Sequence, residues 1–244
     1  MELDALVIEA RSPASLAGFW SRALGWEVRE APAGDVELLP ADGVTTFRLV
    51  FRPASVDEKV GQNPIHLDLT TSSPADQQES AANLLATGAG HIDVGQRGDE
   101  GHVVLADPEG NELCLIEPGN DFLASCPRLG AVNCDGTRAL GHFFSAVLAW
   151  PLVWDQDEET AIQSPAGTGP KITWSGPPLL PKAPRERIHL HVAPARGTST
   201  DAAVAELLRH GATYAEPRHG CAGVIPLADV DGNAVCLVGR SPAG

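Results

Sequence analysis

Hydrophobic and polar positions follow two spacings along the chain, and their order repeats. Residues 3–10 alternate every second position, as in a strand, and apolar residues at helical spacing follow Ser12 and Pro13. Gly25 ends this helix, because glycine readily takes the left-handed conformation at a helix end. Short strand candidates then follow at 26–30, 36–40 and 45–52. The pattern predicts a module of one strand, one helix and three strands.

The same module recurs three more times. In the second copy a strand at 65–70 precedes a helix that opens at Ser73-Pro74 and closes at Gly88. His66 and His189 are 123 residues apart, as are Gly88 and Gly211, so one half of the chain duplicates the other. The predicted modules are 1–58, 59–118, 128–180 and 181–244, with a linker at 119–127. We therefore predict an α+β protein with two domains, 1–118 and 128–244.

Charge and cysteine content limit the classes of binding partner and the cellular compartment that we expect. The net charge of −15 and the pI near 4.8 exclude nucleic acid and anionic membrane surfaces as expected partners, whereas a neutral or cationic small molecule stays open. The first residues show neither a signal peptide nor a membrane span. Five cysteines without a Cys-x-x-Cys pair predict free thiols. We expect a cytoplasmic protein.

Several motifs in a fixed order resemble one family. They are Phe19-Trp20 before Leu24-Gly25-Trp26, the strand with His66, Thr87-Gly88-Ala89, and the turn Asp107–Asn111. The second half repeats this order, ending in the turn Asp229–Asn233. This arrangement resembles the vicinal-oxygen-chelate superfamily, especially its glyoxalase-like and bleomycin-resistance branch. The resemblance implies four βαβββ modules that pair into two curled mixed sheets, each with an open cup. We expect each half of the chain to form one cup.

The resemblance also implies where a metal would bind. Enzymes of the superfamily hold a divalent metal with a His or Gln on the first strand of a module and a Glu on the last. The matching positions in this sequence are Ala5, His66 and Cys114 in the first half, and Leu129, His189 and Cys236 in the second. Neither half retains the family's ligand set, so we expect no metal cofactor. The alternative is a remodelled site for Zn or Fe at His189, His191 and Cys236.

Strand alternation selects the candidate site residues. Ile65, Leu67 and Leu69 must face the helix, so the side chains between them line the cup. The predicted first-half site consists of Glu9, His66, Asp68, Glu112 and Cys114. Catalysis there would use Glu9, His66 and Glu112 as acid and base. In the structural alternative, His66 and Glu112 only form hydrogen bonds with each other and with neighbouring backbone groups. The second-half lining residues are His189, His191 and Cys236.

Three functions stay open from the sequence. The leading hypothesis is a metal-free protein that binds an organic metabolite or antibiotic. The alternative is an enzyme of the superfamily, a lyase, an isomerase or a natural-product tailoring enzyme, that uses acid–base chemistry or a remodelled metal site. An interaction scaffold with filled cups is the third. The internal repeat predicts either a monomer that acts as a pseudo-dimer or a homodimer.

Overall fold

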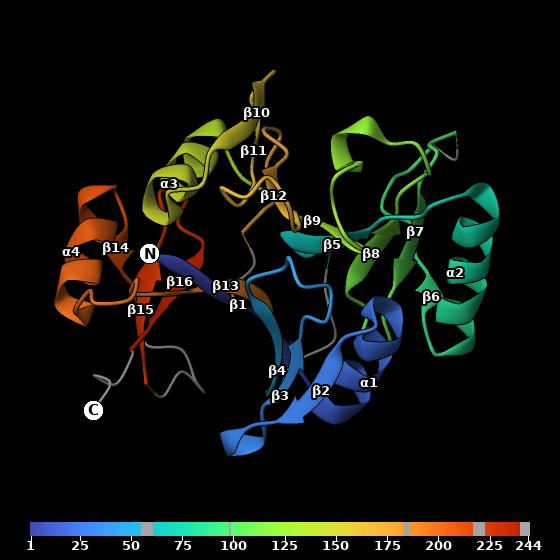
Figure 1. The fold of residues 1–244 in the computed structure, drawn as a ribbon, viewed down its shortest axis with the longest axis horizontal. Helices are drawn as coiled ribbons and strands as arrows, with labels where there is room; N and C mark the ends of the chain where they lie inside the picture. The colour runs from blue at the N-terminus through green and yellow to red at the C-terminus, as the bar shows by residue number, and fades with distance from the viewer. Residues whose placement is uncertain (55–60, 98, 183–185, 217–222, 240–244) are drawn as a thin grey trace.

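The computed structural model describes residues 1–54, 61–97, 99–182, 186–216 and 223–239, which contain four modules in the predicted order (Figure 1). The first module comprises β1 (Glu2–Ala10), α1 (Pro13–Leu24), β2 (Glu27–Glu30), β3 (Val36–Leu39) and β4 (Arg48–Pro53), with a 3₁₀ turn at Pro32–Gly34. The second comprises β5 (Ile65–Leu69), α2 (Pro74–Ala86), β6 (Gly90–His91), β7 (Val103–Ala106) and β8 (Glu112–Leu115). The short 3₁₀ helix Asp121–Leu123 lies in the predicted linker.

The second half repeats the arrangement. Its third module comprises β9 (Leu129–Cys134), α3 (Arg138–Leu148), β10 (Leu152–Gln156), β11 (Glu159–Ile162) and β12 (Lys171–Trp174). The fourth comprises β13 (Ile188–Ala193), α4 (Thr200–Arg209), β14 (Thr213–Tyr214), β15 (Val224–Ala228) and β16 (Ala234–Val238). The predicted α+β class and the strand–helix–three-strand order are therefore confirmed.

Local chemistry explains the element boundaries. Gly25 ends α1 with a φ of 71°, as predicted from the preference of glycine for this conformation. The strand expected at 45–52 begins only at Arg48. The Asp42 carboxylate accepts hydrogen bonds from the backbone N–H groups of Val44 and Thr45, at 2.9 and 2.7 Å, and holds that segment in a turn.

Each sheet combines modules from opposite halves of the chain. Sheet A has the order β14-β15-β16-β13-β1-β4-β3-β2, and sheet B has the order β10-β11-β12-β9-β5-β8-β7-β6. The first module therefore pairs with the fourth, and the second with the third. Figure 1 shows this as blue β1 beside orange β13, and teal β5 beside yellow-green β9. The two sheets are open, mixed and of eight strands each.

The expectation that residues 1–118 and 128–244 form one cup each is therefore not met. Antiparallel pairing joins β1 to β13 from Glu2 opposite Ala193 to Ile8 opposite Ile188. The central strands of all four modules are apolar, so the sequence pattern does not decide which two pair. The linker instead runs between the second and third modules, which share sheet B.

One hydrophobic core joins the two sheets. Its members come from all four modules, among them Leu6, Trp20, Leu67, Phe144 and Leu190. Trp26 and Trp150 belong to this core as well. The helices supply their apolar sides to it, which leaves the opposite face of each sheet to carry the polar positions. In the part of the chain that the structure describes, every helix is too short or too polar to cross a lipid bilayer.

Candidate functional site

The duplication places two equivalent groups of three side chains on the two sheets. His66, Asp68 and Cys114 form the trio of sheet B, and their potential ligand atoms all lie within 4.8 Å of one another. His189, His191 and Cys236 form the trio of sheet A, with the same spacing limit. In each case a first strand supplies two residues and the last strand of the same module supplies the cysteine. We call the sheet faces that carry them cup B and cup A.

Strand geometry puts the sheet B trio together as predicted. Ile65, Leu67 and Leu69 point into the core, so His66 and Asp68 point the other way. Parallel pairing of β5 with β8 sets Asp68 directly beside Cys114. Nε2 of His66 lies 3.4 Å from Oδ1 of Asp68. The strand alternation thus accounts for the whole trio.

The trio of sheet B favours a protonated histidine. Burial opposes protonation, but contacts with the Asp68 carboxylate and the Cys114 thiol outweigh it and raise the pKa of His66 to about 10. For the Cys114 thiol, burial raises the pKa, because the charged thiolate is disfavoured away from water, whereas His66 lowers it. At neutral pH we therefore expect an imidazolium paired with a carboxylate, next to a protonated thiol.

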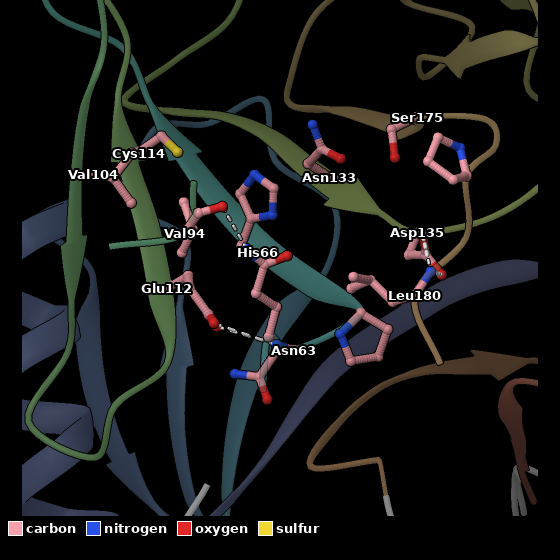
Figure 2. A pocket seen from close by; sticks show the side chains of 13 residues that line it. Asn63, His66, Val94, Val104, Glu112, Cys114, Asn133, Asp135, Ser175 and Leu180 are labelled. Carbon is pink, nitrogen blue, oxygen red and sulfur yellow. Dashed lines mark hydrogen bonds between the residues drawn. The ribbon is translucent and has the colours of Figure 1, made fainter. Parts of the chain in front are cut away.

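A pocket of about 230 Å³ opens over His66 and Cys114 in cup B (Figure 2). The ring of His66 lies between Cys114 on one side and Asn133 of β9 on the other. The polar lining residues are Gln62, Asn63, His66, Glu112, Asn133, Asp135 and Ser175, and the apolar ones include Val94, Val104 and Leu180. The pocket therefore draws on strands and loops of both halves of the chain.

Glu112 lies in this pocket but has a structural contact. Its carboxylate oxygens accept from the backbone N–H of Asn63 at 3.3 and 3.4 Å, and the Asn63 amide donates to Asn111 Oδ1 at 3.0 Å. Asn111 in turn belongs to the turn that Asp107 organises, with bonds of 2.8 and 2.9 Å. Glu112 and His66 thus line one pocket, and Glu112 also anchors the loop that enters β5.

Glu9 does not join His66. It lies on β1 in sheet A, beside Arg52 of β4, and is 3% exposed. The prediction had placed Glu9 in one cup with His66 because it assumed that consecutive modules pair. Since the first module pairs with the fourth, Glu9 belongs to the face of sheet A, where His189 lies opposite Val7. Of the three proposed catalytic residues, only His66 and Glu112 share a pocket.

The trio of sheet A has the opposite electrostatics. His189, His191 and Cys236 are all buried, and the two imidazole rings lie 5.1 Å apart. Burial, followed by the nearby His189 and the arginines Arg52 and Arg48, lowers the pKa of His191 to about 2. His191 is therefore neutral in the folded protein.

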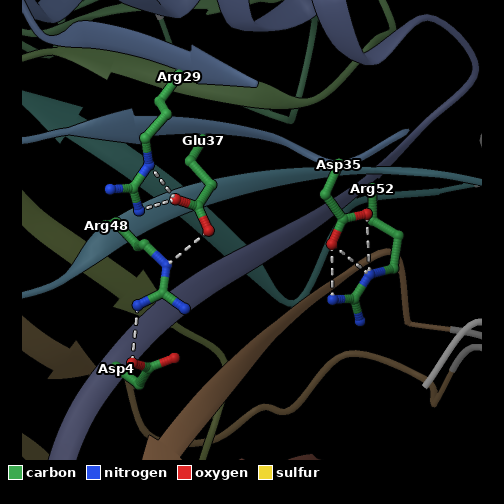
Figure 3. A network of polar contacts seen from close by, with 6 residues as sticks. All are labelled: Asp4, Arg29, Asp35, Glu37, Arg48 and Arg52. Atoms are coloured by element: carbon green, nitrogen blue, oxygen red, sulfur yellow. Dashed lines mark hydrogen bonds and ion pairs between the residues drawn. The ribbon is translucent and has the colours of Figure 1, made fainter. Parts of the chain in front are cut away.

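The two arginines near His191 belong to a network of charged residues of the first module (Figure 3). Arg48 donates to Asp4 at 2.7 Å and to Glu37 at 3.2 Å, and Glu37 also accepts from Arg29. Arg52 pairs with Asp35 at 2.9 Å. The arginines of β4 are thus fixed by carboxylates next to the histidine pair.

The two trios differ in how well they fit a metal. A histidine must be deprotonated at the nitrogen that binds a metal. The Asp68 carboxylate instead stabilises the protonated form of His66. The trio of sheet B therefore does not fit a metal near neutral pH. The trio of sheet A offers neutral His191, His189 and one thiol within 4.8 Å, a donor set that suits Zn or Fe. Ala5 and Leu129, at the other family ligand positions, are buried apolar residues.

Sequence reasoning missed part of the lining of cup B. Asn133 stands directly opposite His66, and Ser175 follows β12 in the same pocket. A second pocket of about 340 Å³ on this face includes Trp154 and Phe122. The missing information was the pairing of the second module with the third, which no local pattern encodes.

Comparisons with known proteins agree with this architecture. The model of the family described as "Glyoxalase-like domain" matches residues 5–116 and again residues 131–238. A search of curated proteins gave no match. Glyoxalase I from Zea mays is similar in structure, with 14% identity and a TM-score of 0.61, over 98% of this chain and 92% of that one. A putative dioxygenase from Bacillus subtilis has 13% identity and a TM-score of 0.57, over 100% and 86% of the two chains.

These two likenesses concern the fold alone, whereas the family model covers most of the sequence in two copies. The resemblance inferred from the motifs is thereby confirmed. The chain belongs to the glyoxalase-like domain family, as a tandem of two such domains.

Proposed function

We propose that this protein binds a small organic molecule in cup B. The observation that carries the proposal is the pocket of about 230 Å³ over His66 and Cys114, which has polar groups on several strands and apolar residues between them. Small-molecule sites are typically concave, with mostly apolar walls and a few fixed polar groups. The pairing of His66 with Asp68 holds the imidazole in place before a ligand arrives.

The charges near the pocket limit the ligand class. Glu112, Asp135 and Asp68 lie in or beside it, and the whole chain carries a net charge of −15. Among the described residues that line the pocket, only His66 is basic and could offset this repulsion of an anionic ligand. A neutral or cationic organic molecule fits better.

A thermal-shift screen tests the proposal. A ligand that binds only the folded state stabilises it by about 2.7 kcal/mol at a hundred-fold excess over Kd, which raises the melting temperature. We expect that compounds which raise the melting temperature of the wild-type protein do not raise that of His66→Ala. The matched control is His91→Ala, an exposed histidine of β6 that does not line the pocket. If every stabilising compound acts equally on the wild type and on His66→Ala, the pocket over His66 is not the site.

Metal-dependent chemistry at the trio of sheet A is the second candidate function. It is favoured by three buried donors within 4.8 Å, one of them a histidine that stays neutral. His189, His191 and Cys236 would hold the ion, which when bound would act as a Lewis acid on a ligand oxygen.

Cobalt substitution separates this candidate from cup B. A thiolate bound to Co²⁺ gives a charge-transfer absorption band in the near ultraviolet. We expect this band to vanish in Cys236→Ser and to persist in Cys114→Ser, the equivalent position of sheet B. No band with the wild type after chelator treatment and Co²⁺ titration would remove the metal candidate.

A further inference from the structure

A second pocket continues cup B away from His66. It has a volume of about 340 Å³ and is lined on one side by Phe122 and Trp154, and on the other by Asp68, Asn133 and Thr173. Asn133 and Ser175 line both pockets, so the two spaces adjoin on one face of the sheet. We call this second space the aromatic lobe.

Strand register aligns the residues of the lobe in one row. His66 pairs with Asn133, Asn133 with Thr173, Thr173 with Ala161, and Ala161 with Trp154. Directly paired residues point to the same face of a sheet, and neighbouring strands are about 4.8 Å apart. Trp154 therefore stands about two strand spacings, or roughly 10 Å, from Thr173. The small side chain of Ala161 leaves space between them.

The polar side of the lobe contains a buried carboxylate and a buried hydroxyl. Asp68 is 8% exposed, and its Oδ1 forms an ion pair with Nε2 of His66 at 3.4 Å. The Thr173 hydroxyl is buried without a hydrogen-bond partner in the described part of the chain. Such a hydroxyl is costly unless another group pairs with it. A ligand N–H group at this point would donate to the Thr173 hydroxyl.

The other side of the lobe is a fixed aromatic wall. Trp154 is 39% exposed, and its ring meets Phe122 edge-on, with centroids 6.1 Å apart and planes at 80°. The Lys171 ammonium lies 4.2 Å above the Phe122 ring and also donates to the Phe122 carbonyl. Phe122 is thereby held in place, and it limits the movement of Trp154. A flat ring can pack against this wall without reorganising it.

We infer that the aromatic lobe binds a planar aromatic molecule that carries an amide or amidine group. The ring packs against Trp154 over Ala161, and the N–H edge points to Thr173, on the side of the lobe where Asp68 lies. This inference rests on the proposed function and specifies the ligand of the same cup. Glu159 also lines the lobe, so a carboxylate in place of the amide meets two acidic side chains.

Four small probes test the ligand class. Benzamide and benzamidine carry the ring and the N–H edge, benzoate carries the ring with a negative charge, and cyclohexanecarboxamide carries the amide without a flat ring. Ligand-observed NMR titrations should give benzamide and benzamidine an affinity at least about ten-fold higher than that of benzoate. Cyclohexanecarboxamide should bind about five-fold more weakly than benzamide. Equal or tighter binding of benzoate would overturn the inference.

Variants locate the binding. Trp154→Ala should lower the affinity for benzamide about five-fold or more, whereas Trp154→Phe should retain most of it. Asp68→Asn should lower the affinity for benzamidine more than that for benzamide, because only the cationic benzamidine is attracted by the Asp68 charge. The control is Val153→Ala, an exposed neighbour on β10 that does not line the lobe. An unchanged affinity in Trp154→Ala, with the fold verified by circular dichroism, would contradict the assignment.

The outcomes separate this inference from the proposed function. A compound from the thermal-shift screen that depends on His66 but not on Trp154 or Asp68 supports ligand binding in cup B and overturns the aromatic lobe. If neither the probes nor any screened compound binds, both fail.

Discussion

His66 and His191 show how the surroundings of a residue set its charge within a repeated scaffold. Each lies on the first strand of its module and faces a cup. Asp68 and Cys114 raise the pKa of His66 to about 10, whereas burial, His189 and the arginines of β4 lower that of His191 to about 2. One histidine therefore carries a charge at neutral pH and the other does not.

We predict that His66 makes the folded state less stable as the solution becomes alkaline. Its pKa is higher in the folded protein than the value near 6.5 of an unfolded chain. The stabilisation is complete below about pH 6.5 and is lost as the pH rises towards about 10. Urea unfolding between pH 6 and 8.5 should show a decline in the wild type that is reduced in His66→Gln. Parallel declines in the two proteins would contradict the raised pKa.

For His191 we predict the opposite pH dependence. Its folded pKa is depressed, so its contribution is present above about pH 6.5 and is lost as the pH falls below that value. Between pH 6.5 and 5 the wild type should therefore lose more unfolding free energy than His191→Gln. The control for the loss of a histidine is His210→Gln, a substitution at an exposed position after α4.

The sequence predicted some of these residues and not others for a physical reason. Alternation along one strand put His66 and Asp68 on the cup face, and the parallel register supplied Cys114. Glu9 follows the same rule along β1, but its neighbours belong to a module at the far end of the chain. Local periodicity fixes the face of a strand and leaves its partner undetermined.

At the scale of elements, the repeated Asp-x-x-Gly-Asn turns serve as caps for helices of other modules. The Glu109 carboxylate accepts from the backbone N–H groups of Arg11 and Ser12, at 2.9 Å each, ahead of α1. In the second half Asp231 accepts from the backbone N–H of Thr137 at 2.7 Å, ahead of α3. Neither helix has a side-chain cap from its own N-cap residue, in contrast to α2 and α4. The turns that suggested the family are therefore structural.

Removing such a cap should destabilise the fold without affecting the cups. We expect Glu109→Ala and Asp231→Ala each to lower the free energy of unfolding by about 1–2 kcal/mol, through loss of the cap and of a negative charge at a helix N-terminus. Urea denaturation measures this loss. Glu79→Ala, an exposed change on α2, should be nearly neutral. A cap variant as stable as Glu79→Ala would show that water replaces the carboxylate at no cost.

Helices were more predictable than edge strands. The helix expected after Ser12 and before Gly25 is α1 itself, because its cap and its end signal are local. In contrast, β6 at the edge of sheet B comprises only Gly90–His91. An edge strand has one partner only, and its length depends on how far that partner extends.

At the scale of the whole molecule, the cross-pairing makes the two halves dependent on each other. β1 and β5 lie at the centres of different sheets, and each has its antiparallel neighbour in the second half. A half on its own would keep the parallel pairs β1–β4 and β5–β8 but would leave the other edge of β1 and of β5 without a partner strand. We predict that residues 1–124 and 125–244, co-expressed as separate chains with a tag on one, will purify together in a one-to-one complex.

Two outcomes would contradict this prediction. In one, either half purifies as a folded monomer, and in the other the two halves fail to associate while both stay soluble. Analytical ultracentrifugation distinguishes a complex of halves from homodimers of one half. The repeat alone predicted four modules correctly, yet it gave no basis for choosing among the three ways of pairing them. The choice depends on contacts between residues 60 or more positions apart in the sequence.

The pairing also bears on how such a chain can change over generations. Because each sheet takes one module from either half, neither half contains a complete cup. A recombination event that exchanged the second half for that of a relative would therefore alter both cups at once. In cup B it would replace Asn133, the neighbour of His66. In cup A it would replace β13, the partner of β1 that carries His189 and His191. Substitutions at single positions, such as the one that distinguishes Asp68 from His191, allow the two cups to diverge separately.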